Sequence, residues 1–172
     1  NLLVKNRLIK FLDGEYAEYD LRGNKVGIAA VKGFGGGFAP HRIVGRGEKA
    51  FRMFIEEEAR EVGKMQQALI VMQKASPEYR VALTHWAAFP ETIEGEPRDL
   101  YPVLGSSLLG DAIELSKPHL ALSGHAHHGP QGIRKARGFI SACNIAYGVN
   151  NGKMLLFDFF APEDVRLRHL EI

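Results

Sequence analysis

The sequence has one cysteine, no long apolar run and almost no net charge, and each of these absences excludes a class of protein. Cys143 cannot form an internal disulfide, which favours a reducing compartment, so we predict a cytoplasmic protein. No apolar run approaches the roughly 18 residues of a membrane span, and no secretory signal pattern opens the chain. A net charge of +2 is too small for a nucleic-acid-binding surface.

What is present fits a soluble globular domain. The 172 residues are 45% apolar and 24% charged, which is enough apolar material for a core. We find no internal repeat or linker, so residues 1–172 are expected to be one domain or part of one. Residues 2–8 resemble the end of an amphipathic helix that lacks an N-cap, and the chain starts with Asn1. We therefore expect it to begin partway through a longer protein.

Hydrophobic periodicity predicts an α/β fold with a mixed sheet, because strands alternate with helices at first and hairpins follow. A long helix is expected over 47–74, with one apolar stripe that includes Phe51, Met65, Leu69 and Met72. A second helix, capped by Ser107, is expected to run to Leu115. Asn150-Asn151-Gly152 is predicted to form a hairpin turn. The expected strands are 16–20, 25–31, 80–84, 118–122, 138–142, 153–159 and 165–172.

Histidines supply the strongest chemical signal. His125 and His127 are two positions apart just after a predicted strand, and in an extended segment their rings would point to the same side. His85 ends an earlier strand, and parallel strands present their carboxyl ends at the same edge of a sheet. Imidazole is a common ligand of zinc, manganese and iron, so the three rings predict a metal site.

The remaining four histidines have a simpler explanation. A lone histidine at a strand end is more often structural than a ligand, and we interpret His41, His119 and His169 in this way. His128 would point away from its neighbours in an extended segment. We expect it to support the site from outside or to lie on the surface.

Two motifs resemble the C-terminal motifs of the calcineurin-like metallophosphoesterases. They are Leu83-Thr84-His85 and Gly124-His125-Ala126-His127, and His125 lies 40 positions after His85. The segments 31–38, 94–97 and 104–107 resemble one bacterial branch of that superfamily. The resemblance implies a two-layer β-sandwich flanked by helices, with two divalent metal ions (Mn, Fe or Zn). His85 and His125 would bind one ion and His127 the other, and together the ions would activate water against a phosphoester.

The resemblance covers only the second part of the family pattern. An Asp-x-His, a Gly-Asp-x-x-Asp and a Gly-Asn-His normally come earlier, and residues 1–172 contain none of them. These motifs would supply the bridging carboxylate, the remaining ligands and the histidine that protonates the leaving group. We therefore predict that residues 1–172 are the C-terminal part of a single metallophosphoesterase domain, inactive alone, with the N-terminal half of the same protein as its partner.

The glycine-rich loop at 33–38 allows two interpretations. It lacks the third glycine of a dinucleotide fingerprint and the ending of a phosphate loop. Gly35 and Gly36 could still present backbone N–H groups to a substrate phosphate. Tight turns that need positive φ are an equal alternative, and Phe34 and Phe38 could line a pocket or close the core.

Two acidic stretches are expected to be less specific. Glu56-Glu57-Glu58 fits a solvated helix face. The loop from Trp86 to Gly105 carries Glu94, Glu96, Arg98 and Asp99, and it could influence substrate choice because loops on a rigid scaffold often do. Cys143 is expected to be buried and unreactive.

Three functions are compatible with these patterns. The first is hydrolysis of a small-molecule or nucleotide phosphoester by a dinuclear metal centre in the complete protein. The others are a non-catalytic partner-binding module of the same fold and a hydrolase with one zinc ion on His85, His125 and His127. A half-sandwich would also expose an apolar face, so residues 1–172 alone are expected to aggregate or form a homo-oligomer.

Overall fold

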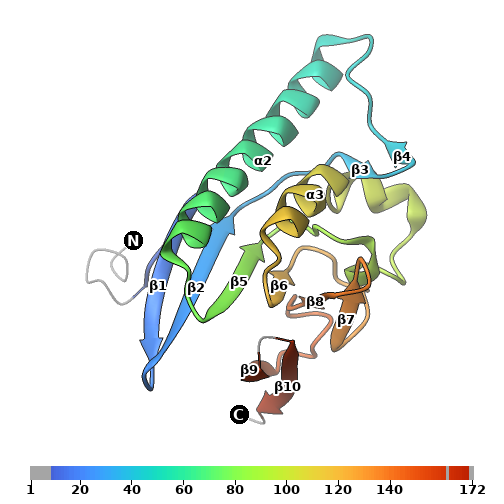
Figure 1. Ribbon diagram of the computed structural model, residues 1–172. Coiled ribbons are helices and arrows are strands. Elements are labelled where there is room, and N and C mark those ends of the chain that lie inside the picture. The colour runs from blue at the N-terminus through green and yellow to red at the C-terminus, as the bar shows by residue number, and fades with distance from the viewer. Residues whose placement is uncertain (1–8, 162, 171–172) are drawn as a thin grey trace.

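A six-stranded mixed sheet forms the centre of the protein, in a computed structural model that describes residues 9–161 and 163–170 (Figure 1). Its strand order is β1-β2-β5-β6-β8-β7. The inner strands β2, β5, β6 and β8 run parallel, and β1 and β7 are antiparallel edges. The strands are β1 (Glu15–Leu21), β2 (Asn24–Val31), β5 (Tyr79–Thr84), β6 (Leu120–Ser123), β7 (Ile133–Ala136) and β8 (Ile140–Asn144). This mixed α/β architecture confirms the predicted fold class.

The first hairpin follows directly from its turn residues. Leu21 pairs with Asn24, which leaves Arg22 and Gly23 as a two-residue turn. Both have positive φ, 58° and 86°, as the right-handed twist of a hairpin requires. The two strands predicted around this turn are confirmed. The helical tail expected at residues 2–8 lies outside the described residues.

Helices α2 (Lys49–Ala75) and α3 (Ser107–Ser116) cover one face of the sheet (Figure 1). Met65, Leu69 and Met72 of α2 are buried against this face, so the predicted apolar stripe is confirmed over the second half of the helix. Phe51, in the same stripe, is exposed, because the first turns of α2 extend past the sheet. Ser76 adopts the left-handed conformation that ends the helix.

The second helix is capped one residue earlier than predicted. Ser106, not Ser107, is the N-cap, and its hydroxyl accepts a hydrogen bond from the backbone N–H of Leu109. Both residues are serines and both can cap a helix, so the local sequence does not distinguish them. Ser106 is selected by its backbone N–H, which donates to Ala87 O and anchors the helix start to the segment after β5.

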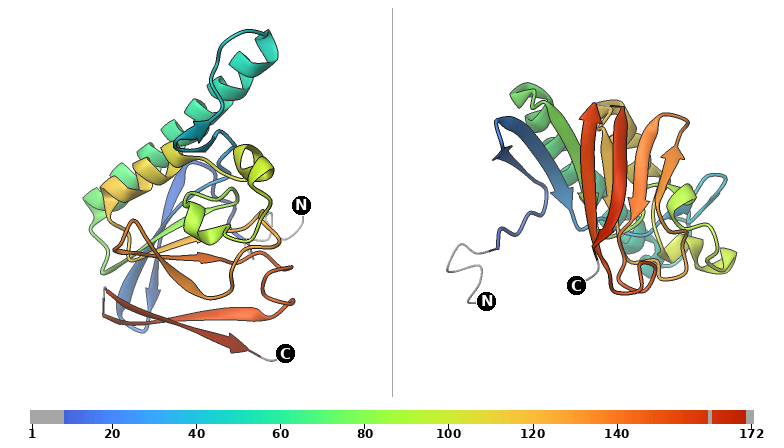
Figure 2. Two further views of the ribbon diagram at one scale, coloured as in Figure 1. Left: turned by 90° about the vertical axis from the view of Figure 1, so that its right-hand side faces the viewer. Right: turned by 90° about the horizontal axis from the view of Figure 1, so that it is seen from below.

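The opposite face of the sheet is covered by a separate hairpin of β9 (Met154–Ala161) and β10 (Asp164–Leu170) (Figure 2). Phe157, Phe159 and Val165 pack on Val26, Val81 and Leu120 of the sheet. The hairpin predicted at residues 150–152 is wrong, because β8 and β9 belong to different sheets and do not pair. Residues 150–152 instead carry the chain from one layer to the other.

The connections contain short elements that periodicity did not predict. Strand β7 pairs with β8 around a tight turn at Arg137 and Gly138. Short strands β3 (Gly37–Phe38) and β4 (His41–Arg42) form a small hairpin, and the loop after β5 contains the 3₁₀ helices η1 (Pro90–Thr92) and η2 (Arg98–Val103). No helix among the described residues is long and apolar enough to cross a membrane.

Candidate functional site

The carboxyl ends of three parallel strands are tied together by backbone hydrogen bonds. The N–H groups of His85 and Trp86, which follow β5, both donate to Lys32 O at the end of β2, at 3.0 and 3.2 Å. Gly124, which follows β6, donates to His85 O at 3.1 Å. The predicted convergence of the two histidine-bearing strand ends is therefore confirmed as a feature of the backbone.

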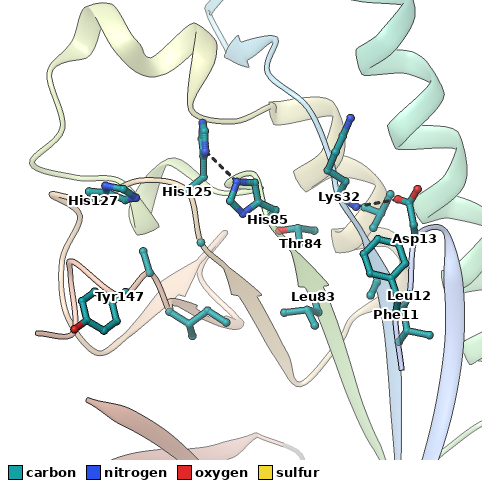
Figure 3. Close-up of a pocket in the computed structure, with 15 residues that line it drawn as sticks. Phe11, Leu12, Asp13, Lys32, Leu83, Thr84, His85, His125, His127 and Tyr147 are labelled. Atoms are coloured by element: carbon teal, nitrogen blue, oxygen red, sulfur yellow. Dashed lines mark hydrogen bonds between the residues drawn. The ribbon is translucent and has the colours of Figure 1, made fainter. Parts of the chain in front are cut away.

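His85 and His125 form a close pair of imidazoles at this edge (Figure 3). His125 Nδ1 lies 3.1 Å from His85 Nε2, and His125 Nε2 lies 3.2 Å from Val103 O. A carbonyl only accepts, so the His125 proton is on Nε2, and Nδ1 is left as the acceptor toward His85. The indole of Trp86 packs on the His125 ring with centroids 4.1 Å apart. The contacts with Val103 O and with Trp86 therefore fix the direction in which the lone pair of His125 Nδ1 points.

The His85 ring is uncharged at neutral pH. Burial lowers the pKa of His85 below its usual value, and positive charge on His125 or His127 would lower it further. Both effects oppose protonation. Uncharged imidazole is the form that binds a metal ion.

His127 lies apart from this pair. In Figure 3 it is on the far side of His125 from His85, and all three rings line one cavity of about 590 Å³. The expected extended segment is not present, because His125 has φ of 66° and turns the chain between the two histidines. The close imidazole pair is consequently His85 with His125, and not His125 with His127.

Glu96 holds the loop that carries His127. Its carboxylate accepts the backbone N–H of His128 at 2.7 Å and contacts that residue's ring Nδ1 at 3.2 Å. Burial raises the pKa of the Glu96 carboxyl, but hydrogen bonds from His128 and from the His127 backbone outweigh this and lower the pKa overall. Glu96 therefore stays ionised as an anchor. Its position in a polar loop did not indicate this contact.

The fit of a metal ion can be tested on the nitrogen positions. Two imidazole nitrogens that each lie ~2.1 Å from one ion are about 3.0–3.4 Å apart. The 3.1 Å between His85 Nε2 and His125 Nδ1 matches that spacing. Within residues 9–161 and 163–170, no group of three or more His, Cys, Asp or Glu side chains is arranged to hold an ion. The spacing of His85 and His125 is thus compatible with two ligands of one ion, and the ligand roles of His85, His125 and His127 all stay predictions.

Asp13 brings a carboxylate to the same cavity, a contribution that the sequence did not indicate. Its oxygens accept Lys64 Nζ at 2.8 Å and the backbone N–H of Lys32 at 3.2 Å. The hydrogen bond from Lys64 is the main reason that the Asp13 pKa is lowered. Figure 3 shows Asp13 across the cavity from the histidines, on the side of Lys32. It fixes the segment before β1 to helix α2.

Gly35 and Gly36 are packed tightly in the glycine-rich loop. The Gly36 N–H donates to Pro102 O at 2.9 Å, and a Cβ on Gly36 would lie 2.0 Å from Glu58 Oε1. Gly33 and Gly37 have φ of 77° and 85°, as the turn alternative requires. The structure thus gives these glycines a packing role, and a substrate contact of Gly35 or Gly36 stays a prediction.

The solvated face expected for Glu56–Glu58 is wrong for Glu58, which is 1% exposed. Its carboxylate accepts Ser106 Oγ and, at 3.1 Å, Arg42 Nη2. Glu61, one turn later, is equally buried and accepts the Gly33 N–H at 2.9 Å. Periodicity did not find this pair, because acidic residues on a helix are ordinarily exposed. The two carboxylates join α2 to the glycine-rich loop and to the start of α3.

The other predicted residues lie as follows. His119 is structural, since its Nδ1 accepts the Arg80 N–H at 3.2 Å, whereas His41 and His169 lie exposed on β4 and β10. Phe38 is buried in the core, and the Phe34 ring contacts the rings of Phe54 and Trp86 at tilted angles. Cys143 is fully buried on β8, and burial raises its thiol pKa to about 11.

Comparison with known proteins yields similarity in fold only. No family model matches the sequence, and no curated protein matches it. Among solved structures, one chain is 16% identical with a TM-score of 0.52, over 98% of this chain and 57% of its own length. A Staphylococcus aureus chain, provisionally named a 5'-nucleotidase and solved in complex with alpha-ketoglutarate, is 13% identical with a TM-score of 0.48, over 90% of this chain and 28% of its own. Residues 1–172 therefore span only part of the length of either chain.

Proposed function

We propose that the complete protein is a metal-dependent phosphohydrolase that cleaves a phosphomonoester or phosphodiester with water activated by a dinuclear metal centre. The observation that carries this proposal is the His85–His125 pair, with nitrogens 3.1 Å apart at the carboxyl ends of adjacent parallel strands. Open α/β sheets bind their ligands at this edge. The cavity beside the pair can admit a phosphoester group, and the motif order resembles the calcineurin-like metallophosphoesterases.

Two divalent ions bound here would supply a hydroxide nucleophile and would neutralise charge on the phosphoryl oxygens. The chain's own residues prepare the ligands. Burial keeps the His85 ring uncharged, and the contact with Val103 O orients His125 so that its Nδ1 faces His85. Trp86 restricts the tilt of the His125 ring. Glu96 positions the loop from which His127 would reach the second ion.

The carboxylate ligands belong, in this proposal, to an N-terminal part of the same protein. A dinuclear centre needs about twice as many ligands as the three histidines provide. Manganese favours oxygen ligands, so carboxylates suit the remaining positions. Asp13, the carboxylate at this cavity, is already bonded to Lys64 and to the Lys32 N–H. The ligand-bearing segment would lie over the cavity on the side of the histidines.

The proposal is tested in the complete protein with the variants His125→Ala and His127→Ala. His169→Ala is the matched control, because His169 is exposed on β10. We expect both site variants to lose at least about 100-fold in Mn²⁺-dependent hydrolysis of p-nitrophenyl phosphate or its diester. Calorimetric titration with Mn²⁺ should show weakened binding in both, and His169→Ala should match wild type.

Unchanged turnover and unchanged metal stoichiometry in His125→Ala would overturn the assignment. A wild-type protein that binds its partner segment but neither Mn²⁺ nor Zn²⁺ would support the non-catalytic module instead. One tightly bound zinc in residues 1–172 alone, lost in His127→Ala, would support the mononuclear zinc site.

A further inference from the structure

A second cavity, of about 540 Å³, lies at the other end of the sheet from the histidine pair. Its lining includes Arg80 at the start of β5, whereas His85 follows the end of that strand. Five residues of extended chain place these two positions about 16 Å apart. The second cavity is therefore a separate site, and nothing in the proposed phosphohydrolase mechanism uses it.

Positive charge dominates this cavity. Arg80, Lys117 and Lys135 line it, and no described carboxylate lies within ion-pair distance of any of them. Arg80 Nη2 donates to Lys117 O at 3.2 Å, and Lys135 Nζ donates to Ser141 Oγ at 3.1 Å. These bonds hold the Arg80 and Lys135 side chains in place but do not neutralise them. An anion bound between them would lower their mutual repulsion.

The acidic groups nearby offset only part of this charge. Among the described residues that line the cavity, Glu163 is the one with an acidic side chain. Asp164 follows it and is bonded to Arg166 at 2.8 Å, although the charge of Lys135 also contributes to its lowered pKa. Three cations against one free carboxylate leave a surplus of two positive charges, which matches a doubly charged anion.

His119 adds an uncharged donor to the same lining. Its Nδ1 accepts the Arg80 N–H, so the ring proton is on Nε2, for which the described residues provide no hydrogen-bond acceptor. Burial, and then the charge of Arg80, lower its pKa to about 4. The ring therefore donates a hydrogen bond at neutral pH without adding charge.

We propose that Arg80, Lys117, Lys135 and His119 form a binding site for a phosphate group, either as free phosphate or as a phosphomonoester. Ammonium and guanidinium donors on three different segments suit a tetrahedral oxyanion, whose oxygens accept from several directions. The cavity is larger than one phosphate ion, and the half-exposed ring of Phe139 lies in its lining. An organic substituent on the phosphate would lie against that ring.

Calorimetric titration of the complete protein with inorganic phosphate at fixed ionic strength tests this site, and adenosine monophosphate is the second probe. We expect saturable binding, and we expect Lys135→Ala and Lys117→Ala each to weaken it by about tenfold, the effect of losing one charge-assisted hydrogen bond. Arg134→Ala is the matched control, because it removes the same charge from the adjacent position of β7 without lining the cavity. It should change the affinity by less than about twofold.

His125→Ala separates this proposal from the proposed function. Phosphate binding that survives His125→Ala but is weakened about tenfold in Lys135→Ala supports the second site, whether or not the protein hydrolyses phosphoesters. Tighter binding of adenosine monophosphate than of phosphate would identify a phosphomonoester as the ligand, and equal binding would identify free phosphate. No saturable binding, or equal losses in Lys135→Ala and Arg134→Ala, would overturn the proposal.

Discussion

Substitution of Gly36 by alanine should destabilise the protein because of one buried carboxylate. A Cβ at this position would lie 2.0 Å from Oε1 of Glu58, far inside contact distance. Glu58 is the end of a flexible side chain, but Ser106 Oγ and Arg42 Nη2 both donate to it and Glu58 is 1% exposed. It cannot move away without giving up these bonds.

The magnitude follows from the hydrogen bonds that would be lost. Each hydrogen bond to a buried charged group contributes about 1.5–3 kcal/mol, so losing two lowers the free energy of unfolding by about 3–6 kcal/mol. That is a large part of the roughly 5–15 kcal/mol that stabilises a typical domain. Gly63→Ala provides the control, because Gly63 lies within α2 and a Cβ there would meet nothing within 4 Å. It should raise the stability by about 0.5–1 kcal/mol through helix propensity.

Urea unfolding followed by circular dichroism measures both variants. The expected result is a lower midpoint for Gly36→Ala and a higher midpoint for Gly63→Ala, with the same dependence on denaturant. A Gly36→Ala protein within about 1 kcal/mol of wild type would refute the reasoning, since it would show that the Glu58 contacts contribute little.

Two further predictions concern titratable groups. The pKa of His119 is about 4 in the folded protein, whereas its ordinary value is 6.5. Between pH 4 and pH 6.5 the unfolded chain therefore binds more protons than the folded protein. The free energy of unfolding should therefore fall by about 2 kcal/mol as the pH drops from 6.5 to 4, and His119→Asn, which can still accept the Arg80 N–H, should flatten that slope in urea titrations. Cys143 is fully buried and burial raises its pKa to about 11, so at pH 8 iodoacetamide should label it only as fast as the protein unfolds. Rapid labelling of the native protein would contradict the buried position.

The elements that could be predicted from the sequence are those whose signals are local. The Arg22-Gly23 turn allows few alternatives, and the four-residue spacing from Met65 to Leu69 identifies the buried side of α2. The layer to which β9 belongs depends on distant contacts, because Phe157 and Phe159 need the apolar face that Val81 and Leu120 provide. A turn sequence at residues 150–152 therefore predicted the wrong partner.

The same distinction applies to the site. Parallel topology predicted that His85 and His125 would approach, since both follow inner strands of one sheet. The contacts of Glu58 and Glu96 were not predictable, because each carboxylate is buried only by segments far away in the sequence. Residue type gave no indication that either carboxylate would be buried, and only the tertiary structure provides their hydrogen-bond donors.

The backbone at His125 connects the fold to the proposed function. A non-glycine residue with φ of 66° costs about 1 kcal/mol, and it persists only where its surroundings hold it. Here Ala126 N donates to Gly124 O at 2.8 Å, Gly124 N donates to His85 O, and Val103 O holds the ring. An extended His125 would lose the Val103 contact and would separate Nδ1 from His85 Nε2. Several contacts thus maintain this strained conformation. The conformation directs one nitrogen of His125 toward one nitrogen of His85 beside an open cavity, and the proposed metal site depends on this pair of nitrogens.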